Sequence, residues 1–195
     1  MLGDTESTDT TEGIFTKTGA VLKGHFLLSS GRHSPIYWEK SKVVQFPDYT
    51  ELLCRMIASH FREQEAQVVA GPTTVGIILA YETAKQLGVR SIFAERESNG
   101  ERTFRRGFSL DPGERVLIVD DILTTGGSIR GVINAVNNLG GRVIGVGVLV
   151  DRSEQPPEFG VPLFSCLRSE VITYATEDCP LCADRIPLVK PGSSA

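Results

Sequence analysis

Three segments of the chain repeat apolar residues with the spacing of an amphipathic helix. In residues 47–61, 75–87 and 129–139 these side chains recur three or four positions apart, which predicts helices with one face toward a core. Glycine follows the second segment at Gly88 and the third at Gly140. A glycine in this place often ends a helix because it adopts left-handed backbone angles at little cost.

Short apolar runs between these helices predict strands, at residues 67–70, 91–94, 116–119 and 143–150. The run at 116–119 is apolar without interruption, as expected of a central strand buried on both faces. Strands that alternate with helices form a parallel sheet whose ligands bind at the carboxyl ends of the strands. We therefore expect an α/β fold with a central parallel sheet flanked by helices.

The remaining segments are polar or rich in proline. Residues 95–106 carry several arginines and glutamates and an Asn-Gly pair, which indicates a mobile loop. Six prolines beyond Asp151 indicate an irregular segment that lies over the core. Residues 1–12 hold four acidic residues and no basic one, which is typical of a disordered tail. After that tail we expect one domain, 13–195, with a core over 46–155 and a small hood from 13–45 and 156–195.

Composition narrows the classes of function. The chain has 195 residues, with 20 Lys plus Arg against 24 Asp plus Glu, which argues against a surface that coats nucleic acid. No apolar run approaches the roughly 20 residues of a membrane span. The acidic N-terminus is unlike a secretory or mitochondrial signal. These features predict a cytoplasmic protein with no nucleic-acid or membrane partner.

Residues 116–128 combine an apolar strand, two carboxylates and a turn of hydroxyl and glycine residues. Free N–H groups at residues 125–128 and the positive end of a helix dipole favour a phosphate there. The adjacent carboxylates of Asp120 and Asp121 can accept hydrogen bonds from vicinal sugar hydroxyls or face a Mg²⁺ ion. A phosphorylated ribose fits both parts of the segment, with its phosphate at the turn and its hydroxyls at the two carboxylates. The turn residues are Thr124, Thr125, Gly126, Gly127 and Ser128.

A simple helix cap or a nucleotide-binding glycine loop accounts less well for this segment. A single aspartate commonly caps the turn into a helix, but a cap does not require two acids followed by Thr-Thr-Gly-Gly-Ser. The glycine patterns of Walker A loops and of Rossmann dinucleotide sites are absent from the sequence. A site for a ribose phosphate is the better interpretation.

The segment resembles the phosphoribosyl-diphosphate motif of type I phosphoribosyltransferases, in which an apolar strand precedes Asp-Asp and a loop of threonine and glycine. Within that family the sequence is most similar to the orotate phosphoribosyltransferases. The similarity also involves residues 23–35, the Val150-Asp151-Arg152 sequence, and the segment 93–108. It covers residues 13–190.

The resemblance implies a pentosyltransferase of de novo pyrimidine biosynthesis. A nitrogen of orotate displaces pyrophosphate from C1 of phosphoribosyl diphosphate and yields orotidine 5′-monophosphate. Such catalysis is largely electrostatic, since Mg²⁺ and cationic side chains stabilise the departing pyrophosphate and closure excludes water. The resemblance also implies a homodimer in which a loop of each subunit reaches the site of the other.

By motif position, the resemblance assigns the ribose hydroxyls to Asp120 and Asp121, and the orotate carboxylate to the planar guanidinium of Arg152. Tyr37 and Trp38 offer flat faces or backbone groups to the base. The expected catalytic residues are Asp120, Asp121 and Arg96. The other expected substrate-binding residues are Ile122, Leu123, Thr124, Thr125, Gly126, Gly127, Ser128, Arg152, Tyr37, Trp38, Thr73 and Thr74.

The sequence departs from the family at Ser29 and Val75, where some members carry lysine. Cationic contacts expected at those positions are therefore missing. Arg96 is then the leading loop cation for the pyrophosphate of the neighbouring subunit. The loop has three other arginines, which are Arg102, Arg105 and Arg106.

Cys179 and Cys182 have the spacing of half a zinc site. No second pair accompanies them, because Cys54 and Cys166 are distant in sequence. We therefore expect structural thiols rather than a zinc centre. The histidines show no spacing typical of metal ligands and are His25, His33 and His60.

Two other functions remain open from the sequence. A purine or uracil phosphoribosyltransferase shares the Asp-Asp-Thr loop but rarely needs a cation such as Arg152 opposite a base carboxylate. An RNA-binding regulator on the same fold would show a basic face. Outside residues 95–106 the chain has no cluster of lysine and arginine.

Overall fold

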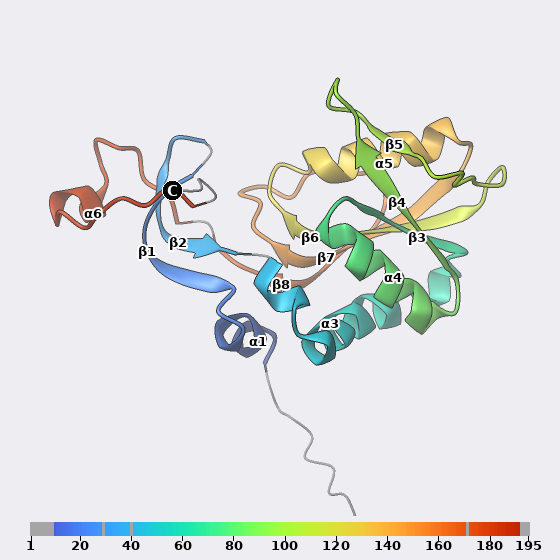
Figure 1. Cartoon of the computed structure of the whole chain (residues 1–195), viewed down its shortest axis with the longest axis horizontal. Coiled ribbons are helices and arrows are strands. Elements are labelled where there is room, and N and C mark those ends of the chain that lie inside the picture. Colours follow the sequence, from blue (N-terminus) through green and yellow to red (C-terminus); the bar gives the residue numbers. More distant parts are fainter. Residues whose placement is uncertain (1–9, 29, 40, 171, 192–195) are drawn as a thin grey trace, which may run out of the picture. The chain divides into compact units, whose positions relative to one another are not determined.

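The structure, a computed structural model, describes residues 10–28, 30–39, 41–170 and 172–191. The chain divides into two compact units. The small unit comes from residues 1–43 and 171–195, and the large unit from residues 44–170 (Figure 1). Most of the expected acidic tail, residues 1–9, lies outside the described residues, and so does Ser29.

A six-stranded sheet forms the centre of the large unit. Its strand order is β5-β4-β3-β6-β7-β8, and every neighbouring pair is parallel except β4 and β5. This confirms the expected sheet, with the apolar run at 116–119 inside it, between β3 and β7. The strands are β3 (Val68–Pro72), β4 (Arg90–Arg96), β5 (Arg102–Phe104), β6 (Arg115–Leu123), β7 (Arg142–Asp151) and β8 (Leu163–Arg168).

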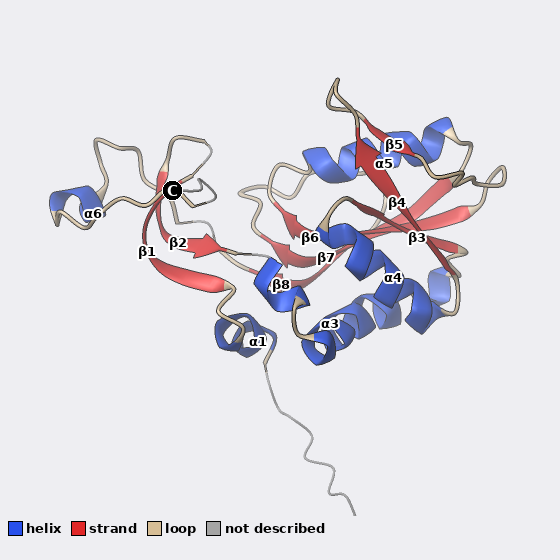
Figure 2. Cartoon of the chain, in the orientation of Figure 1, coloured by secondary structure: helices blue, strands red, loops and turns tan. Residues whose placement is uncertain are grey.

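Helices cover both faces of this sheet (Figure 2). On one face, Val132 of α5 (Gly127–Asn138) shares a core cluster with Ile118 of β6. The other face carries α3 (Pro47–His60) and α4 (Val75–Leu87). The three helices expected from apolar spacing are therefore confirmed. The large unit also contains the short helix η1 (Arg62–Gln64), and α2 (Ser41–Val44) lies where the two units join in sequence.

The segment after Asp151 is more regular than expected. Its β8 pairs in parallel with β7, so the expectation of an irregular chain is wrong there. The prolines do not prevent this strand because Pro162 directly precedes it, and a proline before a strand removes no ladder hydrogen bond within it. Residues 156–170, which we expected in the hood, lie in the large unit.

The polar segment 95–106 is a hairpin rather than an irregular loop. Glu95 pairs with Thr103, and Arg96 pairs with Arg102, across β4 and β5. Polar composition is misleading here because an edge strand keeps charged side chains in solvent while its backbone pairs with a neighbour.

The small unit joins the N-terminal segment to the C-terminal tail. Its strands β1 (Val21–Leu27) and β2 (His33–Trp38) pair antiparallel. The backbone N–H of Val189 donates to the carbonyl of His25 over 2.8 Å, and Tyr174 donates to His33 over 2.8 Å. The two terminal segments of the expected hood therefore pack together. The small unit also contains α6 (Pro180–Ala183).

Helix α1 (Thr11–Lys17) begins inside the segment expected to be disordered. The hydroxyl of Thr10 accepts a hydrogen bond from the N–H of Gly13 over 3.1 Å, as a helix cap does. The expected disorder is therefore wrong for residues 10–12. Among the described residues, no helix has the length and apolar content needed to cross a membrane.

Candidate active site

Asp120 and Asp121 lie near the carboxyl end of β6 and are almost completely buried. The N–H of Asp121 donates to Oδ1 of Asp120 over 2.8 Å, and the N–H of Ile122 donates to Oδ1 of Asp121 over 2.6 Å. These backbone bonds fix both carboxylates. Because successive strand residues face opposite sides of a sheet, Asp120 lies on the α5 side with Ile118, and Asp121 lies on the side of α3 and α4.

The strand continues two residues beyond the acidic pair, through Leu123, before the turn begins. From the sequence we expected the strand to end at residue 119, because two charged residues usually follow a buried strand rather than continue it. Leu123 is completely buried. Its carbonyl accepts a hydrogen bond of 2.8 Å from the N–H of Arg152, so the structure assigns it a role in joining β6 to the end of β7.

The turn after β6 presents the N-terminus of α5. Thr124 and Thr125 are exposed. Gly126 has a φ of 77°, and a Cβ there would lie 2.9 Å from Cζ of Phe159. Only glycine meets both conditions without strain. Within the described residues no side chain caps α5, so its first N–H groups are suited to an anion.

Arg102 of the hairpin reaches this turn from β5. Its Nη2 donates to the Ser128 hydroxyl over 2.9 Å, and its Nη1 lies 3.5 Å from the Thr73 hydroxyl. The stem of the side chain crosses α5 at Gly131, where a Cβ would come within 3.2 Å of it. Partial burial lowers the pKa of Arg102, and the negative charge of Asp120 acts in the opposite direction.

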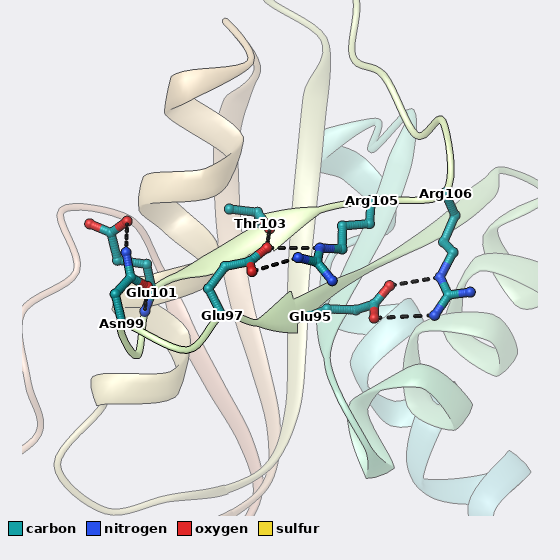
Figure 3. A network of polar contacts seen from close by, with 7 residues as sticks. All are labelled: Glu95, Glu97, Asn99, Glu101, Thr103, Arg105 and Arg106. Atoms are coloured by element: carbon teal, nitrogen blue, oxygen red, sulfur yellow. Dashed lines mark hydrogen bonds and ion pairs between the residues drawn. The ribbon is translucent and has the colours of Figure 1, made fainter.

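Two other arginines of the hairpin pair with glutamates of the same hairpin (Figure 3). Arg105 holds Glu97 through bonds of 2.8 and 2.6 Å, and Arg106 holds Glu95 through bonds of 2.8 and 3.3 Å. The hydrogen bond from Arg106 lowers the pKa of Glu95. For Glu97, the bond from the Thr103 hydroxyl is the main cause of a lowered pKa. Arg96 is exposed.

Thr73 and Thr74 follow β3 and lead directly into α4. The N–H of Thr73 donates to the carbonyl of Ala94 over 3.0 Å. Together with Arg102, this bond joins the loop after β3 to β4 and to the N-terminus of α5. The structure thus brings the expected Thr73 and Ser128 together through Arg102.

Arg152 comes directly after β7 and is partly buried. Burial lowers the pKa of its guanidinium. The neighbouring Asp151 is buried and accepts bonds of 2.9 and 2.6 Å from the N–H and hydroxyl of Ser153. Asp151 pairs with Leu123 in the sheet register, so Arg152 lies beside the end of β6. Sequence reasoning did not single out Ser153, because a serine after a strand carries no distinctive signal.

Tyr37 and Trp38 belong to β2 of the small unit. Trp38 is 7% exposed and packs edge-on against Phe15, with ring centroids 5.2 Å apart. Tyr37 lies 5.6 Å from the ring of Phe26. Trp38 thus belongs to the core of that unit, and the contribution of both residues to a base site stays a prediction.

The parallel sheet and the strand-turn-helix site are those of a phosphoribosyltransferase. The family "Phosphoribosyl transferase domain" matches residues 45–181 of the chain. The chain is 57% identical over 180 residues to an orotate phosphoribosyltransferase of Pelotomaculum thermopropionicum, and 53% identical over 180 residues to one of Caldanaerobacter subterraneus. Each alignment covers 92% of this chain and 94% of the relative.

A crystal structure of orotate phosphoribosyltransferase from Aeropyrum pernix superposes with a TM-score of 0.69 at 30% identity. The superposition covers 80% of this chain and 91% of that chain. The chain therefore belongs to the orotate phosphoribosyltransferase family, as the resemblance of its motifs implies.

Proposed function

We infer that this chain transfers the 5-phosphoribosyl group of phosphoribosyl diphosphate to orotate, and so yields orotidine 5′-monophosphate and pyrophosphate in de novo pyrimidine biosynthesis. The observation that carries this inference is the arrangement at the carboxyl end of β6. There a buried acidic pair precedes an uncapped helix N-terminus, and Arg152 follows the neighbouring strand. The choice of orotate as the nucleobase rests on the relatives, which are named orotate phosphoribosyltransferases.

Each part of a phosphorylated ribose has a chemical partner in this arrangement. The N-terminus of α5 and the hydroxyls of Thr124, Thr125 and Ser128 suit the 5-phosphate, because N–H groups, hydroxyls and the helix dipole all favour an anion. The carboxylates of Asp120 and Asp121 suit the ribose hydroxyls, which donate hydrogen bonds that only an acceptor can receive. Charge on the ribose in the transition state is then stabilised by the same acids.

The site also fits Mg²⁺. That ion is usually held by one or two carboxylates together with phosphate oxygens of the substrate, and the acidic pair offers this donor set. When bound, Mg²⁺ stabilises negative charge on the departing pyrophosphate. Thr73 and Arg102 lie on the β3 side of the turn and are suited to the same group.

The partly buried Arg152 is proposed to recognise orotate. The planar guanidinium offers two parallel N–H donors that match the carboxylate of orotate. Uracil and adenine lack that carboxylate. We further propose a cytoplasmic homodimer in which the β4–β5 hairpin of one subunit reaches the site of the other.

Consumption of orotate by the purified protein tests the proposal. We expect it to require both phosphoribosyl diphosphate and Mg²⁺, and we expect uracil and adenine to compete poorly. Arg152→Ala should raise KM for orotate about tenfold or more, as expected for a charge-assisted contact, and should leave KM for phosphoribosyl diphosphate nearly unchanged.

Arg142→Ala is the matched control, because Arg142 is exposed at the opposite end of β7. Its KM values should stay at the level of the unchanged protein. Faster consumption of adenine or uracil than of orotate would overturn the proposed substrate. If Arg152→Ala moved both KM values together, Arg152 would be a structural residue.

A further inference from the structure

Four side chains that are capable of binding a metal converge in the small unit. His25 lies in β1, His33 begins β2, Cys179 precedes α6, and Cys182 lies in α6. One ligand atom from each lies within 4.8 Å of all the others. Among the described residues this is the one group of three or more histidine, cysteine or acidic side chains so arranged.

Three nitrogen–sulfur distances within this cluster are close to those of a tetrahedral zinc centre, and its two ring nitrogens lie closer together than in such a centre. Sγ of Cys179 lies 3.5 Å from Nε2 of His25, and Sγ of Cys182 lies 3.7 Å from the same nitrogen. Sγ of Cys182 also lies 3.3 Å from Nδ1 of His33, and the two ring nitrogens are 2.9 Å apart. Tetrahedral zinc, with its usual bond lengths, separates nitrogen from sulfur by about 3.6 Å and two nitrogens by about 3.4 Å.

The surroundings of His25 orient it for ligation. Its Nδ1 lies 2.8 Å from the carbonyl oxygen of Ile186. Because a carbonyl oxygen only accepts, Nδ1 carries the proton, and the lone pair of Nε2 points into the cluster. Zinc-binding histidines commonly have such a partner on the other ring nitrogen. The second nitrogen of His33 lies 3.5 Å from the hydroxyl of Thr176, a longer contact of the same kind.

Apart from backbone hydrogen bonds to the β1–β2 hairpin, the described part of the C-terminal tail has few buried contacts that hold it in the small unit. The buried apolar side chains described in this unit come from its N-terminal segment, with Cys179 as the exception. Helix α6 buries no residue, and Ile186, Leu188 and Val189 are 40–50% exposed. A unit with a small core commonly depends on a metal or a disulfide.

We propose that His25, His33, Cys179 and Cys182 form a structural zinc site that fastens the C-terminal tail to the β1–β2 hairpin. Two thiolates and two imidazoles are the ligand set that zinc prefers, and four protein ligands fill its tetrahedron, so the centre is structural rather than catalytic. His25, His33 and Cys179 are at most 4% exposed, and the exposed Cys182 leaves a path for the ion.

The expectation of structural thiols did not foresee two histidines beside Cys179 and Cys182. Sequence reasoning looked for a second closely spaced pair near the cysteines. The other two ligands instead come from a hairpin more than 140 residues earlier, and bridges of that hairpin to the tail, Phe26 with Val189 and His33 with Tyr174, bring them together. The sequence separation between these two histidines and the two cysteines follows no known metal-site pattern, so the sequence does not mark the histidines as ligands.

Metal content measured by mass spectrometry tests the site. The full chain is produced without a histidine tag and purified without chelator, and we expect about one zinc per chain, as for a structural site. Cys179→Ala and His33→Ala should each reduce the zinc content below about one tenth of that value, because a site with three ligands binds far more weakly. Cys166→Ala is the matched control, since this thiol lies in β8 of the large unit, and it should retain the metal.

A second measurement uses the unaltered chain, so that the test still holds if the substituted variants fail to fold. The unaltered chain is stripped with a chelator, and its thermal unfolding is followed before and after zinc is returned. We expect stripping to lower the unfolding temperature and zinc to restore it. Cobalt in place of zinc should show the visible absorption of a tetrahedral thiolate site.

Three results would overturn the proposal. The first is a chain that holds no zinc as purified and binds none when zinc is added. The second is equal loss of zinc in Cys166→Ala and Cys179→Ala. The third is a disulfide between Cys179 and Cys182 in protein prepared without oxygen. These measurements use no substrate, so their outcome is independent of the proposed transferase activity.

Discussion

Asp120 and Asp121 are adjacent in sequence, but the structure gives them different surroundings. Asp120 faces the side of α5 and interacts electrostatically with Arg102, and Asp121 faces the other side of the sheet. In both cases a backbone N–H donates to one carboxylate oxygen. An asparagine keeps that acceptor oxygen, so Asp→Asn exchanges preserve the local fold while removing the charge.

We predict that Asp120→Asn and Asp121→Asn each lower kcat/KM by more than tenfold, about 1.4 kcal/mol of transition-state stabilisation or more. The reason is that an amide replaces one acceptor oxygen by a donor and removes the negative charge that stabilises the ribose. Steady-state kinetics measure the loss, and circular dichroism checks that the fold is unchanged. Near-normal turnover in both variants would contradict the assignment of the acidic pair.

Arg102 is the residue whose position differs most from what the sequence suggested. Its contacts with Ser128 and Thr73 place a positive charge at the turn between β6 and α5 of its own chain. We predict that Arg102→Ala lowers kcat/KM for phosphoribosyl diphosphate about tenfold or more, since a charged contact is worth about 1.5–3 kcal/mol. KM for orotate should change little.

Arg105→Ala provides the control for this prediction. Arg105 comes from the same hairpin but pairs with Glu97 and is more than half exposed. Surface ion pairs of this kind contribute little, so its kinetics should stay close to those of the unchanged protein. Equal kinetic losses in both variants would show that the hairpin acts as a whole and that Arg102 has no special contact.

At the scale of elements, the turn between β6 and α5 depends on the backbone of Gly126. We predict that Gly126→Ala destabilises the protein by about 1–3 kcal/mol, because it combines a strained positive φ with overpacking against Phe159. Urea unfolding measures the change. Gly127→Ala is the matched control, since its Cβ would meet nothing closer than Thr125 at 3.8 Å. Equal stability of the two variants would show that the turn adapts without cost.

At the scale of the whole molecule, the hairpin connects one subunit to another in the proposed homodimer. Two of its arginines are held by glutamates of the same chain, and Arg102 contacts Ser128, but the side chain of Arg96 is exposed. Arg96 therefore remains our candidate for the contact across subunits. A loop cation that acts only on closure contributes to turnover more than to binding of the product.

We predict that Arg96→Ala dimers and Asp121→Asn dimers, each nearly inactive, recover activity when their subunits exchange. A mixed dimer carries both lesions in one site and leaves the other site intact. With random exchange about half of the dimers are mixed, so activity should reach about one quarter of normal. Native mass spectrometry verifies the exchange. If exchange occurs without recovery, Arg96 serves the site of its own chain.

The sequence by itself determined the order and type of the main elements of the large unit. The three long helices and four of the strands follow from apolar periodicity, because burial of one face is a local requirement that each segment carries in its own residues. The turn that we propose to bind phosphate was equally visible, since Asp120 to Ser128 are contiguous. Segment 95–106 was missed because edge pairing leaves little apolar signal. Segment 163–168 was missed because the prolines around it indicated an irregular chain.

Only the tertiary structure decided which distant residues meet. Arg102 reaches Ser128 because the antiparallel pairing of β5 with β4 directs it over the N-terminus of α5. The histidines of the β1–β2 hairpin meet Cys179 and Cys182 because the tail pairs with that hairpin. Such contacts depend on strand register and on chain reversals between remote segments. Local spacing carries no record of either, so the contact of Arg102 with Ser128 and the proposed zinc site became visible only in the fold.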